Sequence, residues 1–477
     1  MSKNLTSGRP ATIILLFTLP LLVGNVFQQM YHFADAFVVG RIIGVDALAA
    51  VGSTGGIAFL LLGFAMGLTA GFAIPTAQAF GAADLPGVRR SVAAGAILTG
   101  AFAVGLTAVA VPLSRPLLVL MRTPPEILDD AHLFIVVSFW GIGAIMFFNF
   151  LSNTIRALGD SRTPLVFLVL SCLLNVVLVV AFIAGLGMGV DGAALATITS
   201  QLVSVLLCLY LVHRKMPVLH LSREDWRVTR AEVTTQLRIG LPMAFQASII
   251  AIGTIVLQYA LNGLGAEAVG AYTAAQKVDG LAMAPLASFG LAIATFTAQN
   301  YGARSYGRIR TGVLHTCLMS IGFALAIGLG NVLLGRHLIR LFVGPGEEHV
   351  VELGQTFLVV NGSLYVALGL LFVLRNALQG MGRTLVPTIA GVAELVTRVG
   401  AALLLATHLG FVGVCLAAPL AWIAGLVPVW ISYHRSRRWL STEEALLAQD
   451  RPTTPPAPPV ETAESLDEAA GTRIAVP

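Results

Sequence analysis

The chain has 477 residues, of which 56% are hydrophobic and 11% are charged, and its mean hydropathy is +0.84. A soluble domain carries about 25% charged residues, so this composition excludes a soluble globular protein and indicates an integral membrane protein. The net charge of +5 does not indicate a nucleic-acid partner, because the basic residues cluster in loops beside the membrane. The cysteines stand singly in apolar stretches, which predicts neither a disulfide framework nor a metal site.

Apolar stretches long enough to cross a bilayer as a helix, about 20 residues, follow one another along the chain. We therefore predict an all-α integral membrane fold. Breaks rich in Gly and Pro, such as Thr123-Pro124-Pro125, separate the stretches. The twelve predicted transmembrane helices span residues 11–39, 47–79, 91–111, 130–152, 164–184, 191–212, 238–261, 268–298, 311–334, 350–375, 386–407 and 412–433.

The first predicted helix contains an acid in an apolar setting. Asp35 is the only acid before Asp46, and a carboxylate inside a membrane helix costs about 2.5–3.5 kcal/mol on insertion scales. We interpret Asp35 as a site of ion or proton traffic, with an acid neutralised by a neighbour for packing as the alternative. Tyr31 precedes it by one helical turn and faces the same side. Pro20 removes a backbone hydrogen bond, and we predict that it kinks this helix.

Lysine and arginine are unevenly distributed between the two sets of loops. Twenty lie at the N-terminus, in alternate loops and at the start of the tail, whereas five lie in the other loops. By the positive-inside rule, both termini face the cytoplasm. The five are Arg41, Arg115, Arg122, Arg336 and Arg340.

The second half of the chain repeats the first. The loop sequence AQAFGAADLPGVRR (77–90) returns as AQNYGARSYGRIR (298–310), and NTIRALGDSRTP (153–164) returns as NALQGMGRTLVP (376–387). Six helices in each half give both halves the same orientation in the membrane, as in parallel-repeat transporters. We therefore expect two pseudo-symmetric lobes joined by a cytoplasmic loop, and a Pro-rich tail that cannot bury a core and is mostly disordered from about residue 444. The predicted units are 1–212, the loop 213–237, 238–435 and the tail 436–477.

These residues carry a family resemblance. The spacing P-x4-N-x2-Q-x2-Y-x3-D-x4-G from Pro20, the paired AQxxGA loops and the ELVTR segment (394–398) resemble the multidrug and toxic-compound extrusion (MATE) family over residues 10–435. The resemblance implies a monomer in the plasma membrane of a prokaryote, in contact with membrane lipid, with two lobes around a central cavity. It also implies alternating access and export of amphipathic, cationic small molecules in exchange for inward protons, without a cofactor. Sodium remains the alternative coupling ion.

The resemblance implies the members of an ion site around Asp35. Relatives complete this site with an asparagine, a second aspartate and a threonine, which fall here at Asn175, Val179 and Thr197. Because Val179 replaces the second acid, the site has one formal negative charge, which favours a proton over sodium. Asn149 is a weaker candidate, because helix counting puts it closer to the cytoplasm. Interhelical hydrogen bonding alone is the alternative role for Asn175 and Thr197.

The second half holds a different set of polar residues, Lys277, Asp279, Glu394 and Arg398. Glu394 and Arg398 are four residues apart and share a helix face. Asp279 and Arg398 lie at similar depths when counted from opposite membrane faces, so we predict that they pair. We interpret the set as a structural ion-pair network, with substrate contact as the alternative, and we take Lys277 and Arg398 to be buried.

Other functional classes fit less well. A flippase for lipid-linked sugars, or an exporter of other anionic metabolites, needs a cationic cavity, and the two cations of this set each lie near an acid in sequence. The chain has no GxxxxGK[ST] phosphate loop, so it does not drive transport by its own ATP hydrolysis. An enzyme in the membrane would need a carboxylate or histidine cluster in its loops, and we do not expect one here.

Overall fold

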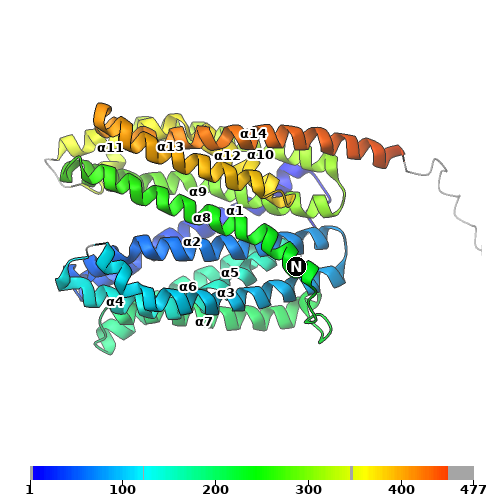
Figure 1. Cartoon of the computed structure of the whole chain (residues 1–477), viewed down its shortest axis with the longest axis horizontal. Helices are drawn as coiled ribbons and strands as arrows, with labels where there is room; N and C mark the ends of the chain where they lie inside the picture. Colours follow the sequence, from blue (N-terminus) through cyan, green and yellow to red (C-terminus); the bar gives the residue numbers. More distant parts are fainter. Residues whose placement is uncertain (1–3, 122, 344–346, 450–477) are drawn as a thin grey trace, which may run out of the picture.

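The computed structural model describes residues 4–121, 123–343 and 347–449. Helices connected by short turns make up this described part, which contains no strand (Figure 1). The helices are α1 (Pro10–Ile42), α2 (Val45–Gly81), α3 (Leu85–Leu120), α4 (Pro125–Trp140), α5 (Ile142–Ala157), α6 (Arg162–Val180), the π-turn η1 (Ala181–Gly185), α7 (Val190–Lys215), the short η2 (Pro217–Leu219), α8 (Arg230–Asn262), α9 (Ala266–Gly302), α10 (Tyr306–Arg340), α11 (Glu348–Ser363), α12 (Tyr365–Gly380), α13 (Leu385–Leu409) and α14 (Phe411–Gln449).

Ten of these helices are individually long and apolar enough to cross a membrane, and two bent pairs bring the possible total to twelve within the described ranges. The pairs are α4 with α5, bent by 45°, and α11 with α12, bent by 48°. The first bend falls at Gly141, where a Cβ atom would collide with the Ile198 side chain of α7. The all-α membrane class is therefore confirmed, and two of the predicted spans are broken helices.

Several helices run beyond the predicted membrane segments. Helix α8 begins within the predicted loop, because Thr229 and Glu232 form a capping box in which each side chain hydrogen bonds to the other residue's backbone N–H. Helix α14 continues to Gln449, so the prediction of disorder from about residue 444 is wrong for 444–449. Leu440 is fully buried and Glu444 pairs with Arg310, which anchors this last stretch to α10. The rest of the predicted tail lies outside the described residues.

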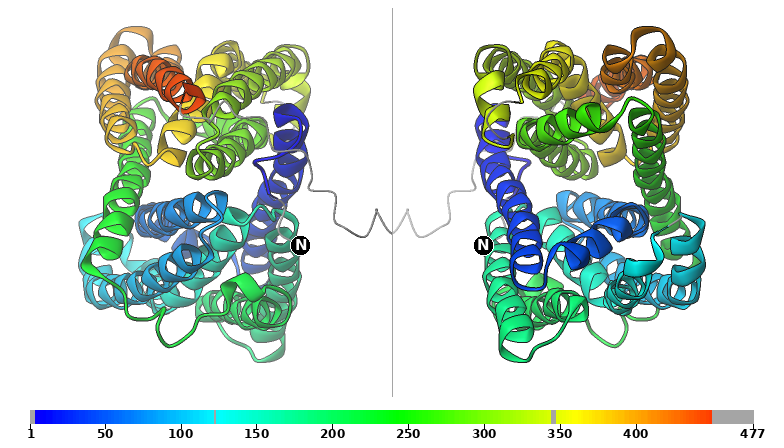
Figure 2. Two further views of the ribbon diagram at one scale, coloured as in Figure 1. Left: turned by 90° about the vertical axis from the view of Figure 1, so that its right-hand side faces the viewer. Right: turned by 90° about the vertical axis from the view of Figure 1, so that its left-hand side faces the viewer.

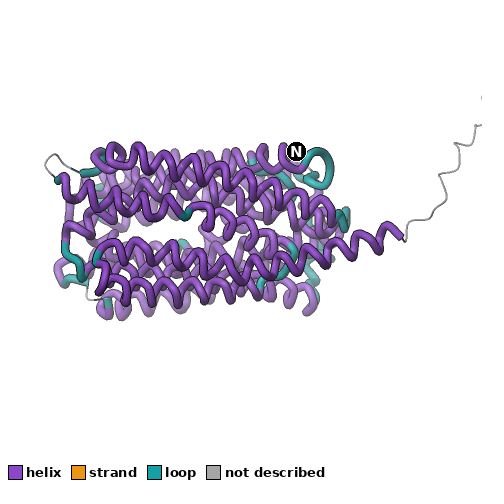
Figure 3. Tube along the Cα trace, turned by 90° about the horizontal axis from the view of Figure 1, so that it is seen from above, coloured by secondary structure: helices purple, strands orange, loops and turns teal. Residues whose placement is uncertain are grey.

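The helices are arranged as two groups with two helices running between them. We call α1–α7 the N-terminal lobe and α8–α14 the C-terminal lobe. Helix α1 packs on α6 of its own lobe and on α9 of the other, and α8 packs on α13 and on α2 in the corresponding way. Figure 2 shows α1 and α8 on opposite sides of the gap between the two groups. Seen from above, the helices run mostly along the long axis of the molecule (Figure 3).

Each lobe has its own apolar core, and the outer faces are apolar as well. Phe139 and Phe150 are buried in the N-terminal lobe, and Phe289 is buried in the C-terminal lobe. Large apolar side chains such as Leu120 and Leu404 are exposed. This distribution suits helices whose backbone groups are satisfied internally and whose outer surface meets lipid.

Pro20 lies inside α1, and the helix is uninterrupted from residue 10 to residue 42. The kink that we predict there therefore does not break the helix. Between consecutive described helices, bends of more than 40° fall at the breaks at Gly141 and Leu364, which the sequence analysis did not single out.

Candidate functional site

Three of the residues predicted around the acid of the N-terminal lobe lie together. The Tyr31 hydroxyl and Thr197 Oγ1 are hydrogen bonded at 2.9 Å, and Asn175 Nδ2 donates to the same Thr197 oxygen at 3.2 Å. These side chains come from α1, α7 and α6, and Asn175 is fully buried. The threonine hydroxyl thus ties the three helices together.

Asp35 follows Tyr31 by one turn of α1 and lies within electrostatic range of it. Its Oδ1 is buried and has no hydrogen-bond partner in the described part of the chain. Asn175 Oδ1 is likewise buried and has no hydrogen-bond partner among the described residues. A buried polar oxygen that lacks a hydrogen bond is costly in free energy. The described residues therefore leave two buried oxygens here, one of the acid and one of the amide, that can still take part in a hydrogen bond.

Val179 occupies the position at which the family resemblance implies a second acid. It is fully buried and packs in an apolar cluster with Val39 and Ala193. Val39 follows Asp35 by one turn of α1, and Ala193 precedes Thr197 by one turn of α7. Its side chain contributes no oxygen to the site. Asn149 donates to the Ile145 carbonyl of its own helix at 2.8 Å. No hydrogen bond among the described residues connects it to the cluster around Thr197, so this weaker candidate stays apart.

The prediction that Asp279 pairs with Arg398 is wrong. Asp279 Oδ1 instead accepts a hydrogen bond of 2.5 Å from the Tyr365 hydroxyl, which itself accepts from Asn331 Nδ2 at 3.1 Å. Within the described ranges, no ion pair joins Asp279 to Arg398. Equal depth in the membrane did not bring the two side chains together, because depth says nothing about the direction in which each helix turns its face.

Glu394 also has a partner other than Arg398. It forms an ion pair with Arg375 of α12, and the two side chains are 6% and 5% exposed. The charge count along the sequence treats Arg375 as a loop residue, whereas the structure buries it inside the lobe. Glu394 and Arg375 therefore form a structural pair between α13 and α12, as the prediction of an ion-pair network requires, but with a different cation.

The two remaining cations of the C-terminal lobe differ in their surroundings. Lys277 is exposed, so the prediction that it is buried is wrong. Arg398 is partly buried, and its Nε is fully buried without a hydrogen-bond partner among the described residues.

The repeated loops form a reciprocal contact between the lobes that sequence reasoning missed. Gln78 at the end of α2 donates from Nε2 to the Gly380 carbonyl of the C-terminal lobe at 2.9 Å. Gln299 at the end of α9 donates from Nε2 to the Ala157 carbonyl of the N-terminal lobe at 2.7 Å. The sequence repeat aligns Gln78 with Gln299 and Ala157 with Gly380. We call this pair of hydrogen bonds the inter-lobe latch.

Glycines allow the backbones to come close at the latch. A Cβ atom at Gly81 would collide with the Gln299 carbonyl oxygen, and one at Gly302 would collide with the Gln78 carbonyl oxygen. Further along the interface, a Cβ atom at Gly71 would lie 2.5 Å from the Cα of Gly240. The lobes are therefore closely packed at the end of the molecule where α2 and α9 end.

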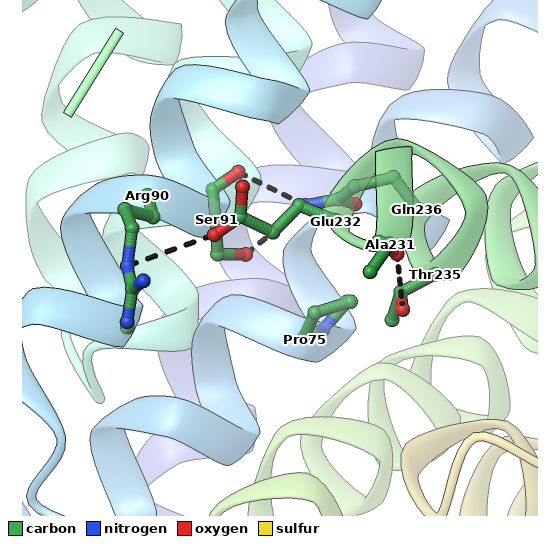
Figure 4. A pocket seen from close by; sticks show the side chains of 8 residues that line it. Pro75, Arg90, Ser91, Ala231, Glu232, Thr235 and Gln236 are labelled. Carbon is green, nitrogen blue, oxygen red and sulfur yellow. Dashed lines mark hydrogen bonds and ion pairs between the residues drawn. The ribbon is translucent and has the colours of Figure 1, made fainter. Parts of the chain in front are cut away.

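A small cavity of about 230 Å³ lies at this same end, where α2, α3 and α8 meet (Figure 4). Gln236 of α8 donates from Nε2 to the Ser91 carbonyl at 2.9 Å, and Arg90 lies 3.6 Å from Glu232 (Figure 4). Both interactions join the two lobes. The cavity therefore belongs to the closed interface.

A scan against family models matches the MatE model at residues 20–183 and again at 242–404, once in each lobe. The chain belongs to the MATE family. Its relatives include a probable multidrug resistance protein, YpnP, of Bacillus subtilis (strain 168), which is 28% identical over 91% of this chain and 97% of the relative. A protein of Shewanella oneidensis (strain MR-1) named FAD transporter is 24% identical over 87% of this chain and 93% of the relative.

The fold of this MATE-family chain also matches solved structures. A crystal structure described as MATE in complex with MaL6 superposes with a TM-score of 0.87, covers 93% of this chain and 100% of that chain, and is 24% identical in sequence. Members of the MATE family are multi-pass membrane transporters rather than enzymes. The same class therefore holds for this chain, and the prediction that it is not an enzyme is confirmed.

Sequence reasoning expected Tyr31, Asn175 and Thr197 to lie together, as their hydrogen bonds show, but it overlooked several other partners. Tyr365 and Asn331 gave no sequence signal, because a tyrosine and an asparagine in apolar helices are common. The latch glutamines did carry a signal, since AQ recurs at 77–78 and 298–299 within matched polar loops. A polar residue repeated at the same place in both halves indicates a contact that the pseudo-symmetry makes twice.

Proposed function

We propose that this transporter is a secondary antiporter that exports amphipathic, cationic small molecules in exchange for inward protons. The observation that carries the proposal is the buried Asp35 oxygen without a partner, beside the Tyr31–Thr197–Asn175 cluster. An acid that is costly to keep charged in this setting gains from binding either a proton or a cationic substrate. Exchange of one for the other at a single carboxylate couples the two flows.

The composition of the cluster supports a proton as the coupling ion. Oxygen-seeking cations bind several oxygens, often with more than one carboxylate among them. Here the one acid of the cluster is Asp35, and the position of the second acid is filled by the buried Val179. A proton needs one carboxylate oxygen, and the neutral acid can then donate a hydrogen bond to a neighbour such as Asn175 Oδ1, which lacks a donor.

The latch supports alternating access from the opposite end. The N-terminus, the ends of α2 and α9, and the start of α8 lie at the end that the lysine and arginine count puts in the cytoplasm. With this end closed, we infer that the described state faces outward. Asp35 lies seven residues before the last residue of α1, about 10 Å along the axis at 1.5 Å per residue. This depth supports a cycle in which the acid takes a proton from outside and releases it once the lobes have reversed their opening.

The names of relatives bear on the substrate. The Bacillus relative is described as a multidrug resistance protein, which supports export of diverse drug-like compounds by this chain in the plasma membrane of a prokaryote. The Shewanella relative is named FAD transporter, which supports the alternative of an anionic metabolite. We take the cationic drug as the main proposal, because the buried Asp35 Oδ1 of the N-terminal lobe has no hydrogen-bond partner in the described part of the chain.

Transport in proteoliposomes with separately imposed gradients tests the proposal. When the medium at the outer face of the transporter is acidic and sodium is equal on both sides, a fluorescent cation should move from the cytoplasmic face to the outer face and accumulate there. A sodium gradient at equal pH should not. Each charge moved through a potential of 100 mV is worth about 2.3 kcal/mol, so the membrane potential should be clamped. Export that follows sodium alone would overturn proton coupling.

A further inference from the structure

Arg398 is a cation without a partner in the middle of a membrane helix. Helix α13 runs from Leu385 to Leu409 and is one of the candidate membrane spans. At 1.5 Å per residue, Arg398 lies roughly 20 Å from one end of this helix and roughly 16 Å from the other. In the described part of the chain, its guanidinium has neither an ion pair nor a hydrogen bond. Charged side chains at such a depth in a membrane helix usually pair with another group, and one without an ion pair or hydrogen bond indicates a functional role.

The acids that could neutralise Arg398 are already engaged. Glu394, one turn away on the same helix, forms the ion pair with Arg375. Asp279 accepts the short hydrogen bond from Tyr365. The charged group that lies within electrostatic range of Arg398 is the Arg375 guanidinium, which repels it. Among the described residues, Arg398 therefore forms no ion pair. The Asp279 carboxylate, which a tyrosine hydroxyl does not neutralise, also lies within electrostatic range of Tyr272.

The surroundings of Arg398 suit an anionic group. A Cβ atom at Gly253 of α8 would lie 3.2 Å from Arg398 Cδ, so the glycine gives the long side chain its place against α8. Tyr272 of α9 lies within electrostatic range of the guanidinium, and no hydrogen bond engages its hydroxyl among the described residues. A guanidinium fork binds a carboxylate or a phosphate through two parallel hydrogen bonds, and a phenol adds a third donor.

We propose that Arg398 and Tyr272 bind the acidic group, a carboxylate or a phosphate, of an amphipathic substrate. The inference rests on the proposed function and narrows its substrate class. Among the described residues, Asp35 Oδ1 in the N-terminal lobe and Arg398 Nε in the C-terminal lobe are buried without a hydrogen-bond partner. A zwitterionic amphiphile has a basic group for the first and an acidic group for the second. Such a substrate would contact both lobes at once, whereas a simple cation would engage only one.

A matched pair of substrates tests the proposal in proteoliposomes of neutral lipid. One is an aromatic amino acid derivative that keeps both its amine and its carboxylate, and the other is its primary amide, which keeps only the amine. Proton-driven export of each is measured, and the readout is the ratio of the acid's kcat/KM to the amide's. The ratio cancels general loss of active protein. Wild-type protein should favour the acid by about tenfold or more, which is the size of one charge-assisted hydrogen bond.

The variants are R398Q, R398K and Y272F, with R336Q as the control. R336Q also removes one positive charge from the C-terminal lobe, but the Arg336 side chain is half exposed and lies 3.9 Å from Glu352 at the surface. R398Q should bring the ratio to about one, R398K and Y272F should lower it by a smaller factor, and R336Q should leave it at the wild-type value. A ratio that is unchanged in R398Q, or lowered equally by R336Q, would overturn the inference.

Further outcomes distinguish failure of the acid site from failure of the proposed proton-coupled export, and substrate binding from lipid binding at Arg398. If wild-type protein exports the amide with the proton gradient but does not favour the acid, the proposed function stands and the acid site is refuted. If neither compound moves under a proton gradient, the proposed function itself fails. The measurement is repeated in vesicles with anionic lipid. An Arg398 effect that appears only there, and equally for both substrates, would assign the guanidinium to a lipid phosphate and overturn the substrate site.

Discussion

The inter-lobe latch offers a prediction about conformational balance. We consider the change of Gln299 to alanine. Gln299 is fully buried and makes two hydrogen bonds: its Oε1 accepts from the Leu5 N–H at 2.9 Å, and its Nε2 donates to the Ala157 carbonyl at 2.7 Å. Leu5 packs in the core of the C-terminal lobe, so the second bond alone joins the two lobes. Q299A therefore removes one hydrogen bond from the closed interface.

The magnitude follows from the group that is left behind. The Ala157 carbonyl loses its Gln299 donor in the closed state, which costs about 1–3 kcal/mol, but it can meet water when the lobes separate. Because about 1.4 kcal/mol changes an equilibrium constant tenfold, Q299A should shift the balance toward the separated state by about 5- to 150-fold. Gln78 is only partly buried, so Q78A should shift it less. The two bonds lie at separate places, and the double variant should approach the sum of the two free-energy changes.

Spin labels at Ala82 and Arg304 measure this balance. Both residues are exposed, at the turns that follow α2 and α9. Wild-type protein at high pH should give one short-distance population, and the double variant should add a population at longer distance. Thermal unfolding serves as a control, since loss of the Leu5 hydrogen bond also weakens the C-terminal lobe. Identical distance distributions in wild-type and double-variant protein, with comparable unfolding temperatures, would refute the latch.

Three further predictions concern other parts of the molecule. Changing Val179 to aspartate adds a second carboxylate to the cluster, and ion-dependent transport should then respond to sodium at constant pH, whereas an unchanged response would show that the position lies outside the ion site. Tyr365→Phe removes the hydroxyl that donates to Asp279 and should lower the unfolding temperature, since a buried acceptor without its donor costs about 1–3 kcal/mol. The same unfolding temperature for both proteins would contradict a stabilising role for this hydrogen bond. In the loop before α8, hydrogen bonds from the Ser222 N–H and hydroxyl hold the pKa of Asp225 below its usual value. This loop is therefore stabilised above about pH 4 and loses the stabilisation as the pH falls through the lowered pKa. The hydrogen-exchange rate of residues 216–229 should rise on acidification in wild-type protein, and in Asp225→Asn it should be high and independent of pH.

Much of the N-terminal site followed from spacing and from the family resemblance. Tyr31 and Asp35 are one turn apart, so a helix must put them on one side. Asn175 and Thr197 lie on other helices, and only the resemblance brought them into the same site. The structure joins both to Tyr31 through the Thr197 hydroxyl. Spacing within one helix is thus a reliable guide, because it depends on local geometry alone.

The C-terminal lobe was harder, because its contacts depend on how separate helices are rotated. Depth counting paired Asp279 with Arg398, whereas a tyrosine just after the α11–α12 bend is the partner of Asp279. The four-residue spacing put Glu394 and Arg398 on one helix face, yet Glu394 forms its ion pair with a buried arginine from α12. A one-dimensional pattern holds no information on helix rotation or on which of two cations comes closer. With Glu394 on Arg375 and Asp279 on Tyr365, Arg398 has no ion pair in the described part of the chain.

The central claim is that Asp35 couples substrate export to proton entry. The most direct measurement is proton uptake during substrate export, recorded with a pH-sensitive dye inside proteoliposomes, for wild-type protein and Asp35→Asn. The asparagine is close to the acid in size and removes a group whose Oδ1 lacks a hydrogen-bond partner, so the variant should fold and insert normally. The account predicts substrate-dependent proton flux in wild-type protein and none in D35N. Equal proton flux in both proteins would contradict it.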